Sequence, residues 1–257
     1  MSCSRKVRAG IITGYGINAD RELAHAFLLS GAESVRIHIN DIISNPDMLE
    51  SFHILAFPGG FSFGDHLGSG LVFAHLFRNN LKEQLDRFIK SGKLIIGICN
   101  GFQVLVKMGV LPNLGRKWEP EFSLVHNSTG VFENSWLTVE FNAVSGCVWT
   151  KGLGDMDVPV RHGEGRFIAA SDSLLKQLED ADLAAVRYKN RNPNGSVNDI
   201  AGITDPTGRI LGLMPHPEAF LFPRNHPGWS RKKIEEGYGL RIFINGVEYI
   251  KGSSCLL

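Results

Sequence analysis

Residues 93–103 read KLIIGICNGFQ and place a cysteine between a strand pattern and a helix pattern. The apolar run 94–98 is short and uninterrupted, as expected of a strand that is covered on both faces. After Cys99, apolar residues recur at helical spacing until Gly109 and Pro112 end the pattern. A strand that turns at once into a helix places Cys99 at the carboxyl end of a sheet.

This position of Cys99 suits a nucleophile. The N-terminus of the following helix favours a thiolate, and nearby backbone N–H groups can bind a developing oxyanion. Gly97 and Gly101 leave room for the sharp turn, which resembles the nucleophile elbow of serine hydrolases with Cys in place of Ser. A free cysteine in an apolar stretch is usually a small buried hydrophobic residue, so a second signal is needed.

The second signal is the segment 214–218, which reads MPHPE and follows another strand-like run. A proline on each side of His216 biases the backbone towards an extended form. Residues i and i+2 of an extended chain point to the same side, so Glu218 is expected beside the imidazole of His216. A Cys nucleophile, a His base and a carboxylate that orients the base form a constellation for covalent catalysis.

The distribution of strand and helix patterns predicts the fold class. In the first half, strands are expected at 7–12, 35–39, 53–57 and 93–98, and helices at 20–30, from 46 and at 81–90. From about residue 122 the pattern changes to strand-like pieces at 136–141, 158–161, 184–188, 200–204 and 210–214, with a last helix at 231–244. We therefore predict an α/β protein with a flavodoxin-like open, mostly parallel sheet, helices on both faces and an antiparallel extension in the second half. No linker or repeat divides the chain, so residues 1–257 are expected to form a single domain.

Composition narrows the class of protein. The 257 residues are 43% hydrophobic and carry a net charge of +1, which allows a large core and gives no electrostatic footprint for nucleic acid or an anionic membrane. No apolar run approaches the roughly 18 residues that span a bilayer, and no signal peptide is visible. The four cysteines, at 3, 99, 147 and 255, lack paired spacing, so neither a disulfide framework nor a metal site is predicted. These features favour a reduced, cytoplasmic location.

A dinucleotide-binding site is an alternative. Residues 14–19 read GYGINA and match the G-x-G-x-x-A fingerprint, and Asp41 lies near the position of the ribose-binding acid. A dehydrogenase, however, would leave Cys99, His216 and Glu218 without a role. This interpretation is therefore disfavoured.

Three further loops join glycine to polar residues. Residues 58–65, PGGFSFGD, follow the third strand and should emerge at the same sheet edge as Cys99. The amide of Gly60 is therefore a candidate oxyanion donor beside that of Asn100. Residues 162–167, HGEGRF, form either a polar hairpin or part of a site, and residues 192–196, NPNGS, are typical of a turn.

Taken together, these segments resemble the class I (triad-type) glutamine amidotransferases, and within them the glutaminase subunits of phosphoribosylformylglycinamidine synthase from purine biosynthesis. The segments that carry the resemblance are GINADRE at 16–22, PGGFSFGD at 58–65, GICNGFQ at 97–103, HGEGRF at 162–167, NPNGS at 192–196 and MPHPE at 214–218. Ala19 stands where the family commonly has Cys, and Ala219 where a basic residue is more usual. From 220 to 257 the match is thin.

The resemblance implies roles for six residues. The catalytic residues would be Cys99 as nucleophile, His216 as general base and Glu218 as orienting acid. The substrate glutamine and the oxyanion would be bound by Gly60, Asn100 and Gln103.

The resemblance also implies partners. Ammonia from glutamine would pass to a synthetase subunit that uses ATP and Mg²⁺ to convert formylglycinamide ribonucleotide to its amidine, with a small accessory subunit as a further candidate partner. No G-x-x-x-x-G-K-[ST] segment occurs in this chain, so no cofactor is expected in it. Two alternatives are a different cysteine hydrolase of the same fold, such as a γ-glutamyl hydrolase or a peptidase, and a non-catalytic regulatory relative.

Overall fold

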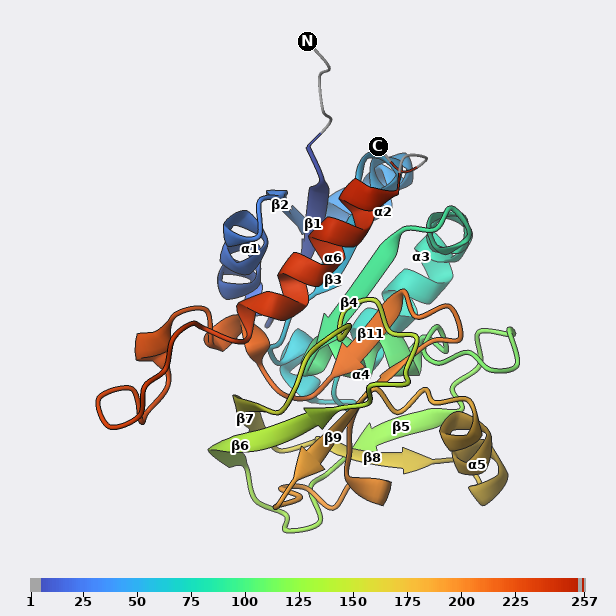
Figure 1. Ribbon diagram of the computed structural model, residues 1–257. Helices are drawn as coiled ribbons and strands as arrows, with labels where there is room; N and C mark the ends of the chain where they lie inside the picture. The colour runs from blue at the N-terminus through green and yellow to red at the C-terminus, as the bar shows by residue number, and fades with distance from the viewer. Residues whose placement is uncertain (1–5, 254–255, 257) are drawn as a thin grey trace.

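The computed structural model describes residues 6–253 and 256 of the chain (Figure 1). Its central element is a nine-stranded sheet. Its parallel half contains, in spatial order, β2 (Glu33–His38), β1 (Arg8–Thr13), β3 (Ile54–Phe57), β4 (Leu94–Ile98) and β11 (Ile210–Leu213). The antiparallel half continues with β10 (Ile200–Thr204), β9 (Val186–Lys189), β6 (Glu133–Phe141) and β7 (Met156–His162). The predicted α/β fold with an antiparallel extension is confirmed.

The strand β11 joins the two halves of the sheet. It runs parallel to β4 and antiparallel to β10. The sequence pattern placed this strand with the antiparallel extension, which is correct for its pairing with β10 and wrong for its pairing with β4. As a neighbour of β4, β11 ends at the same sheet edge as the strand that leads to Cys99.

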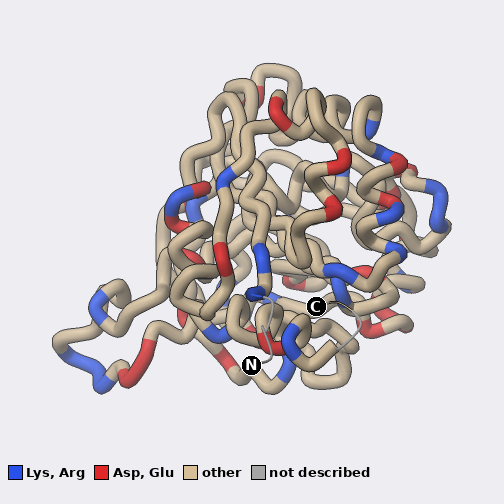
Figure 2. Tube along the Cα trace, turned by 90° about the horizontal axis from the view of Figure 1, so that it is seen from above, with Lys and Arg blue, Asp and Glu red and all other residues tan. Residues whose placement is uncertain are grey.

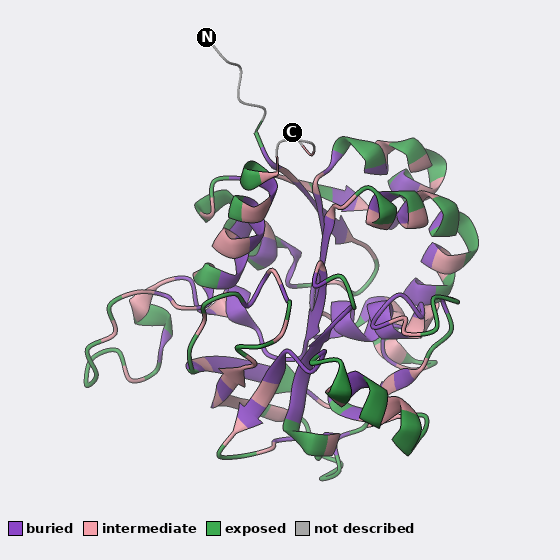
Figure 3. Cartoon of the chain, turned by 45° about the vertical axis from the view of Figure 1, so that its right-hand side comes forward, coloured by how far each residue is buried: buried purple, intermediate pink, exposed green. Residues whose placement is uncertain are grey.

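Helices cover both faces of the parallel half. The helices α1 (Asp20–Leu29) and α6 (Leu240–Gly252) pack together on one face, while α3 (Leu71–Lys90) and α4 (Asn100–Lys107) lie on the other. Figure 3 shows that the central strands are buried and that the outer helix surfaces are exposed. This double covering explains why β3 and β4 are apolar at every position.

Shorter elements complete the chain. Two further helices are α2 (Ile39–Ser44) and α5 (Asp172–Asp180), and the 3₁₀ turns are η1 (Pro46–Ser51), η2 (Ser62–Asp65), η3 (Val197–Asp199), η4 (Pro217–Ala219) and η5 (Pro223–Asn225). A separate antiparallel pair, β5 (Phe122–Val125) with β8 (Arg166–Ala169), packs against α4. Its rings Phe122 and Phe167 stack with centroids 5.2 Å apart, and Phe167 also stacks on Phe102 of α4.

Two predicted helix boundaries were wrong. The helix expected at 81–90 begins at Leu71, and Phe73, Phe77, Leu81 and Leu85 form one buried face at helical spacing. The helix expected at 231–244 instead spans 240–252. Before it, the backbone at Gly239 passes so close to Pro217 that an added Cβ would lie 2.1 Å from that carbonyl oxygen.

The helix α6 is held by close packing on an aromatic ring. A Cβ added at Gly246 would lie 2.4 Å from Cζ3 of Trp149, whereas nothing lies within 4 Å of the corresponding point at Gly252. On the same face, Phe243 and Phe27 make an edge contact with centroids 5.2 Å apart. The C-terminal helix is thus part of the core.

Acidic and basic residues are interspersed over the molecule (Figure 2). Within the described ranges, none of the helices has the length and apolar character needed to cross a membrane. Cys147 is a buried free thiol, as is Cys99, while Cys3 and Cys255 lie outside the described residues.

Candidate active site

The turn at Cys99 is a strained elbow. Cys99 follows β4 directly, precedes α4 and has φ 51° and ψ −107°, a positive-φ conformation that is uncommon for a residue with a side chain. The turn depends on its glycines, because a Cβ at Gly101 would lie 1.9 Å from the carbonyl oxygen of Phe57. At Gly97 it would lie 2.6 Å from Leu105. The predicted strand-to-helix turn is present.

His216 and Glu218 form a buried pair beside this elbow. Leu213 of β11 is in register with Ile98 of β4, so the segment after β11 emerges next to Cys99. His216 Nδ1 lies 2.6 Å from Oε1 of Glu218, and both residues are buried. The predicted proximity is confirmed, but its explanation was wrong, because Glu218 lies in the 3₁₀ turn η4 and not in an extended chain.

The charge of the His216 imidazole is set by its neighbours. Burial lowers its pKa, but the Glu218 carboxylate and a Cys99 thiolate outweigh the burial and raise the pKa of His216 to about 10. Its Nε2 atom is buried without a hydrogen-bond partner among the described residues. An imidazolium held by Glu218 can stabilise a thiolate at Cys99 and later release a proton.

A cavity of about 370 Å³ opens over these groups. Cys99, His216 and Gly60 line it, together with the charged residues Glu22 and Arg161. A second hollow of about 190 Å³ shares Cys99 and Gly60 and extends to Gln103. A small polar substrate can therefore reach the Cys99 thiol.

The backbone N–H groups of Asn100 and Gly60 remain candidate oxyanion donors. Asn100 is the first residue of α4, so its N–H has no intrahelical acceptor. Gly60 pairs with Ile17 in an isolated bridge whose hydrogen bonds are donated by Asn18 and Phe61, not by Gly60. Gly60 has φ 152° and packs against the backbone of Gly16. A Cβ added at Gly60 would lie 2.8 Å from the carbonyl oxygen of Gly16.

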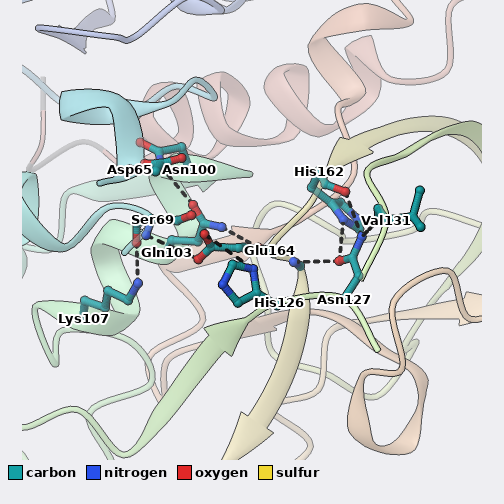
Figure 4. Close-up of polar contacts among 11 residues, drawn as sticks. Asp65, Ser69, Asn100, Gln103, Lys107, His126, Asn127, Val131, His162 and Glu164 are labelled. Carbon is teal, nitrogen blue, oxygen red and sulfur yellow. Dashed lines mark hydrogen bonds and ion pairs between the residues drawn. The ribbon is translucent and has the colours of Figure 1, made fainter. Parts of the chain in front are cut away.

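The side chain of Gln103 belongs to a polar network beneath the site (Figure 4). Its Nε2 donates to the Glu164 carbonyl oxygen at 2.5 Å, and its Oε1 accepts from Asn100 Nδ2 at 2.9 Å. Lys107, one turn further along α4, donates to the carbonyl oxygen of Ser69. Gln103 thus joins α4 to the loop after β7, and its role in binding glutamine stays a prediction.

The loop 162–167, which the sequence left open, forms one wall of the second hollow. Asn127 holds it: Oδ1 accepts from the Gly165 N–H at 3.1 Å and from His162 Nδ1–H at 3.2 Å, and Nδ2 donates to the His162 carbonyl oxygen at 2.9 Å (Figure 4). Burial lowers the pKa of His162 to about 4, so this imidazole is neutral at pH 7.

The turn 192–196 also contacts the loop 162–167 and holds it in place. Asn194 is fully buried, and its Nδ2 donates to the Gly165 carbonyl oxygen at 2.8 Å and to Tyr188 Oη at 3.1 Å. Asn127 and Asn194 were missed as site residues because their partners are distant in sequence. Composition showed only a turn at 192–196.

The GYGINA segment does not form an open phosphate loop. A Cβ at Gly16 would lie 2.1 Å from the carbonyl oxygen of Phe61, because the loop 58–65 packs directly onto this turn. The space that a pyrophosphate would need is filled by protein backbone. Within residues 6–253 and 256, no group of three or more His, Cys, Asp or Glu side chains is arranged to hold a metal ion.

A family model described as a CobB/CobQ-like glutamine amidotransferase domain matches residues 6–250. The chain belongs to this glutamine amidotransferase family. Relatives of this amidotransferase named phosphoribosylformylglycinamidine synthase subunit PurQ include one from Dehalococcoides mccartyi, 42% identical over 96% of this chain and 98% of the relative. Another, from Methanococcus maripaludis strain C5, is 41% identical over 93% of this chain and 97% of the relative.

Solved structures agree with this assignment. The amidotransferase is similar to a chain of PurLQS from Thermotoga maritima, with a TM-score of 0.74 and 28% identity over 95% of this chain and 99% of that chain. A glutamine amidotransferase from the same organism has a TM-score of 0.55 and 16% identity over 97% of this chain and 100% of that chain, a likeness in fold alone.

Proposed function

We propose that this chain is the glutaminase component of phosphoribosylformylglycinamidine synthase. The observation that carries the proposal is the strained Cys99 elbow facing a cavity beside the buried His216–Glu218 pair. The names of relatives that are 41–42% identical over nearly the whole chain supply the synthase. The reaction is hydrolysis of the glutamine side-chain amide, which gives glutamate and ammonia.

The geometry supports a covalent mechanism. The Cys99 thiolate attacks the amide carbon of glutamine, and the N–H groups of Gly60 and Asn100 bind the resulting oxyanion. His216 gives its proton to the leaving nitrogen, ammonia departs and a γ-glutamyl thioester remains on Cys99. His216 then takes a proton from water, which attacks the thioester and releases glutamate, while Glu218 keeps the imidazole oriented.

The ammonia has a destination outside this chain. A synthetase subunit, supplied with ATP and Mg²⁺, would use it to convert formylglycinamide ribonucleotide to the amidine, within an ATP-dependent carbon–nitrogen ligase complex. A small accessory subunit is a further proposed partner, and the complex would act in the cytoplasm. This chain itself needs no cofactor for the hydrolysis, because nucleophile, base and oxyanion donors are all protein groups.

A Cys99→Ala variant tests the proposal in the reconstituted complex. We expect loss of glutamine-dependent amidine synthesis, while synthesis from added ammonium salt is retained because free ammonia reaches the synthetase directly. Cys147→Ala is the matched control, since Cys147 is a buried free thiol away from the cavity, and it should retain both activities. Equal loss of both activities in Cys99→Ala would contradict the assignment.

A further inference from the structure

The mechanism leaves two charged residues of the cavity without a role. Glu22 comes from α1 and Arg161 from β7, and both line the cavity over Cys99. Their charged groups approach only to 4.0 Å, between Arg161 Nη1 and Glu22 Oε2, and the side chains are 42% and 49% exposed. Such a long, half-exposed ion pair adds little stability to the fold.

Both residues lie close to the nucleophile. The Arg161 carbonyl oxygen lies 3.7 Å from Cys99 Sγ. The backbone of Arg161 is therefore next to the thiol, and the guanidinium group of Arg161 is no more than about the length of its own side chain away. Ala19, at the start of α1, lines the same cavity one helical turn before Glu22. The two charges therefore border the space that a substrate on Cys99 would occupy.

The charge of Glu22 is not fully compensated by protein groups. Burial and the nearby Glu218 carboxylate raise its pKa, and the charges of Arg161 and His216 only partly oppose this. A cation bound at Glu22 would compensate the negative charge of its carboxylate. Arg161, in turn, presents a planar fork of N–H donors that fits a carboxylate.

Free glutamine carries one positive and one negative charge, which are complementary to Glu22 and Arg161. With its side-chain amide at Cys99, the α-carbon still bears an ammonium and a carboxylate. We propose that Glu22 binds the α-ammonium group and Arg161 the α-carboxylate group of the substrate glutamine. The substrate would replace one long ion pair with two short ones, at no change in the net charge of the site.

This inference rests on the proposed glutaminase function and refines its substrate. A glutamine residue inside a peptide has neutral amides in place of the two α-charges. Such a residue shields both Glu22 and Arg161 from water and offers neither a charged group, which leaves only the long pair between them and costs binding energy. The pair thus selects free glutamine over peptide-linked glutamine, and so separates this site from that of a peptidase.

The test is a crossed substrate experiment on the reconstituted complex. Glu22→Gln and Arg161→Gln are compared with wild type on glutamine, N-acetylglutamine, which lacks the ammonium, and glutamine α-amide, which lacks the carboxylate. On glutamine, each variant should raise KM by about 10- to 100-fold, the loss of one charged hydrogen bond, with a much smaller change in kcat. Glu33→Gln, which breaks an exposed pair with Arg8, is the matched control and should leave KM unchanged.

The crossed pattern decides the assignment. Glu22→Gln should lose the preference for glutamine over N-acetylglutamine and keep the preference over the α-amide, whereas Arg161→Gln should do the reverse. An unchanged KM, or equal loss of both preferences in each variant, would overturn the inference while leaving the glutaminase intact. Absence of glutamate release by the wild-type complex would instead overturn the proposed function, and this inference with it.

Discussion

Replacing Asn194 by alanine tests whether the turn 192–196 holds the loop behind the nucleophile. Besides its two bonds to Gly165 and Tyr188, the Asn194 side chain accepts from Ser196 N at 3.0 Å and from Ser196 Oγ at 2.7 Å. Alanine removes all four hydrogen bonds from a fully buried position. The groups left behind lie in the protein interior, where water does not replace the lost partners.

The expected cost follows from which groups keep a second partner. The Ser196 N–H still has Asn192 Oδ1 at 3.3 Å, and the Gly165 carbonyl oxygen still has Ser196 Oγ at 3.4 Å. At about 1 kcal/mol net per lost bond, with the desolvation cost of Tyr188 added, the free energy of unfolding should fall by about 2–4 kcal/mol. For a chain of this size, that lowers the thermal midpoint by about 4–16 °C.

Urea and thermal unfolding of purified variants measure this loss. Asn80→Ala is the matched control, because Asn80 lies on the exposed face of α3 and its side chain donates a hydrogen bond to the Leu76 carbonyl oxygen in the same helix. It should stay within about 0.5 kcal/mol of wild type. If Asn194→Ala also stays within that range, the turn does not hold the loop, and the reasoning is refuted.

Three further outcomes are expected. The pKa of His216 is about 10 in the folded protein against an ordinary 6.5, so its interactions with Glu218 and Cys99 stabilise the fold fully below pH 6.5 and progressively less up to pH 10. Urea unfolding across this range should show a pH slope in wild type that is smaller in Glu218→Gln, where Cys99 still raises the pKa of His216 but the carboxylate no longer does, and an equal slope in both would refute the pairing. Gly246→Ala should destabilise the fold by about 1–3 kcal/mol through its clash with the tryptophan ring, while Gly252→Ala in the same helix should not, as calorimetry can measure. Glutamate release by the isolated chain should be slow and should accelerate on mixing with the synthetase, because uncoupled hydrolysis loses ammonia to solvent; full turnover by the chain alone would contradict this.

Local patterns in the sequence were sufficient for the elbow. A buried strand, a glycine on each side and a helix pattern within residues 93–109 dictate the turn at Cys99. The pair His216 and Glu218 was also within reach, since two residues so close in sequence meet in either an extended chain or a 3₁₀ turn. The sequence therefore predicted the proximity of His216 and Glu218 correctly, although the backbone there forms a 3₁₀ turn and not the expected extended chain.

Other features depend on contacts that no local pattern contains. Asn127 and Asn194 acquire their roles from Gly165, which belongs to another segment. Glu22 and Arg161 meet only because α1 and β7 converge on the same cavity. The start of α3 was missed for a different reason, since a glycine-rich loop before Leu71 obscured an apolar repeat that was present in the sequence.

The neighbouring positions of β4 and β11 affect how the protein acquires activity. The entire antiparallel half lies between these two strands along the chain, so their pairing closes a very long loop, which carries an entropy cost. A nascent or partly folded chain therefore has its cysteine but lacks the histidine beside it. The cysteine and the histidine are therefore brought together only when β11 is in place beside β4.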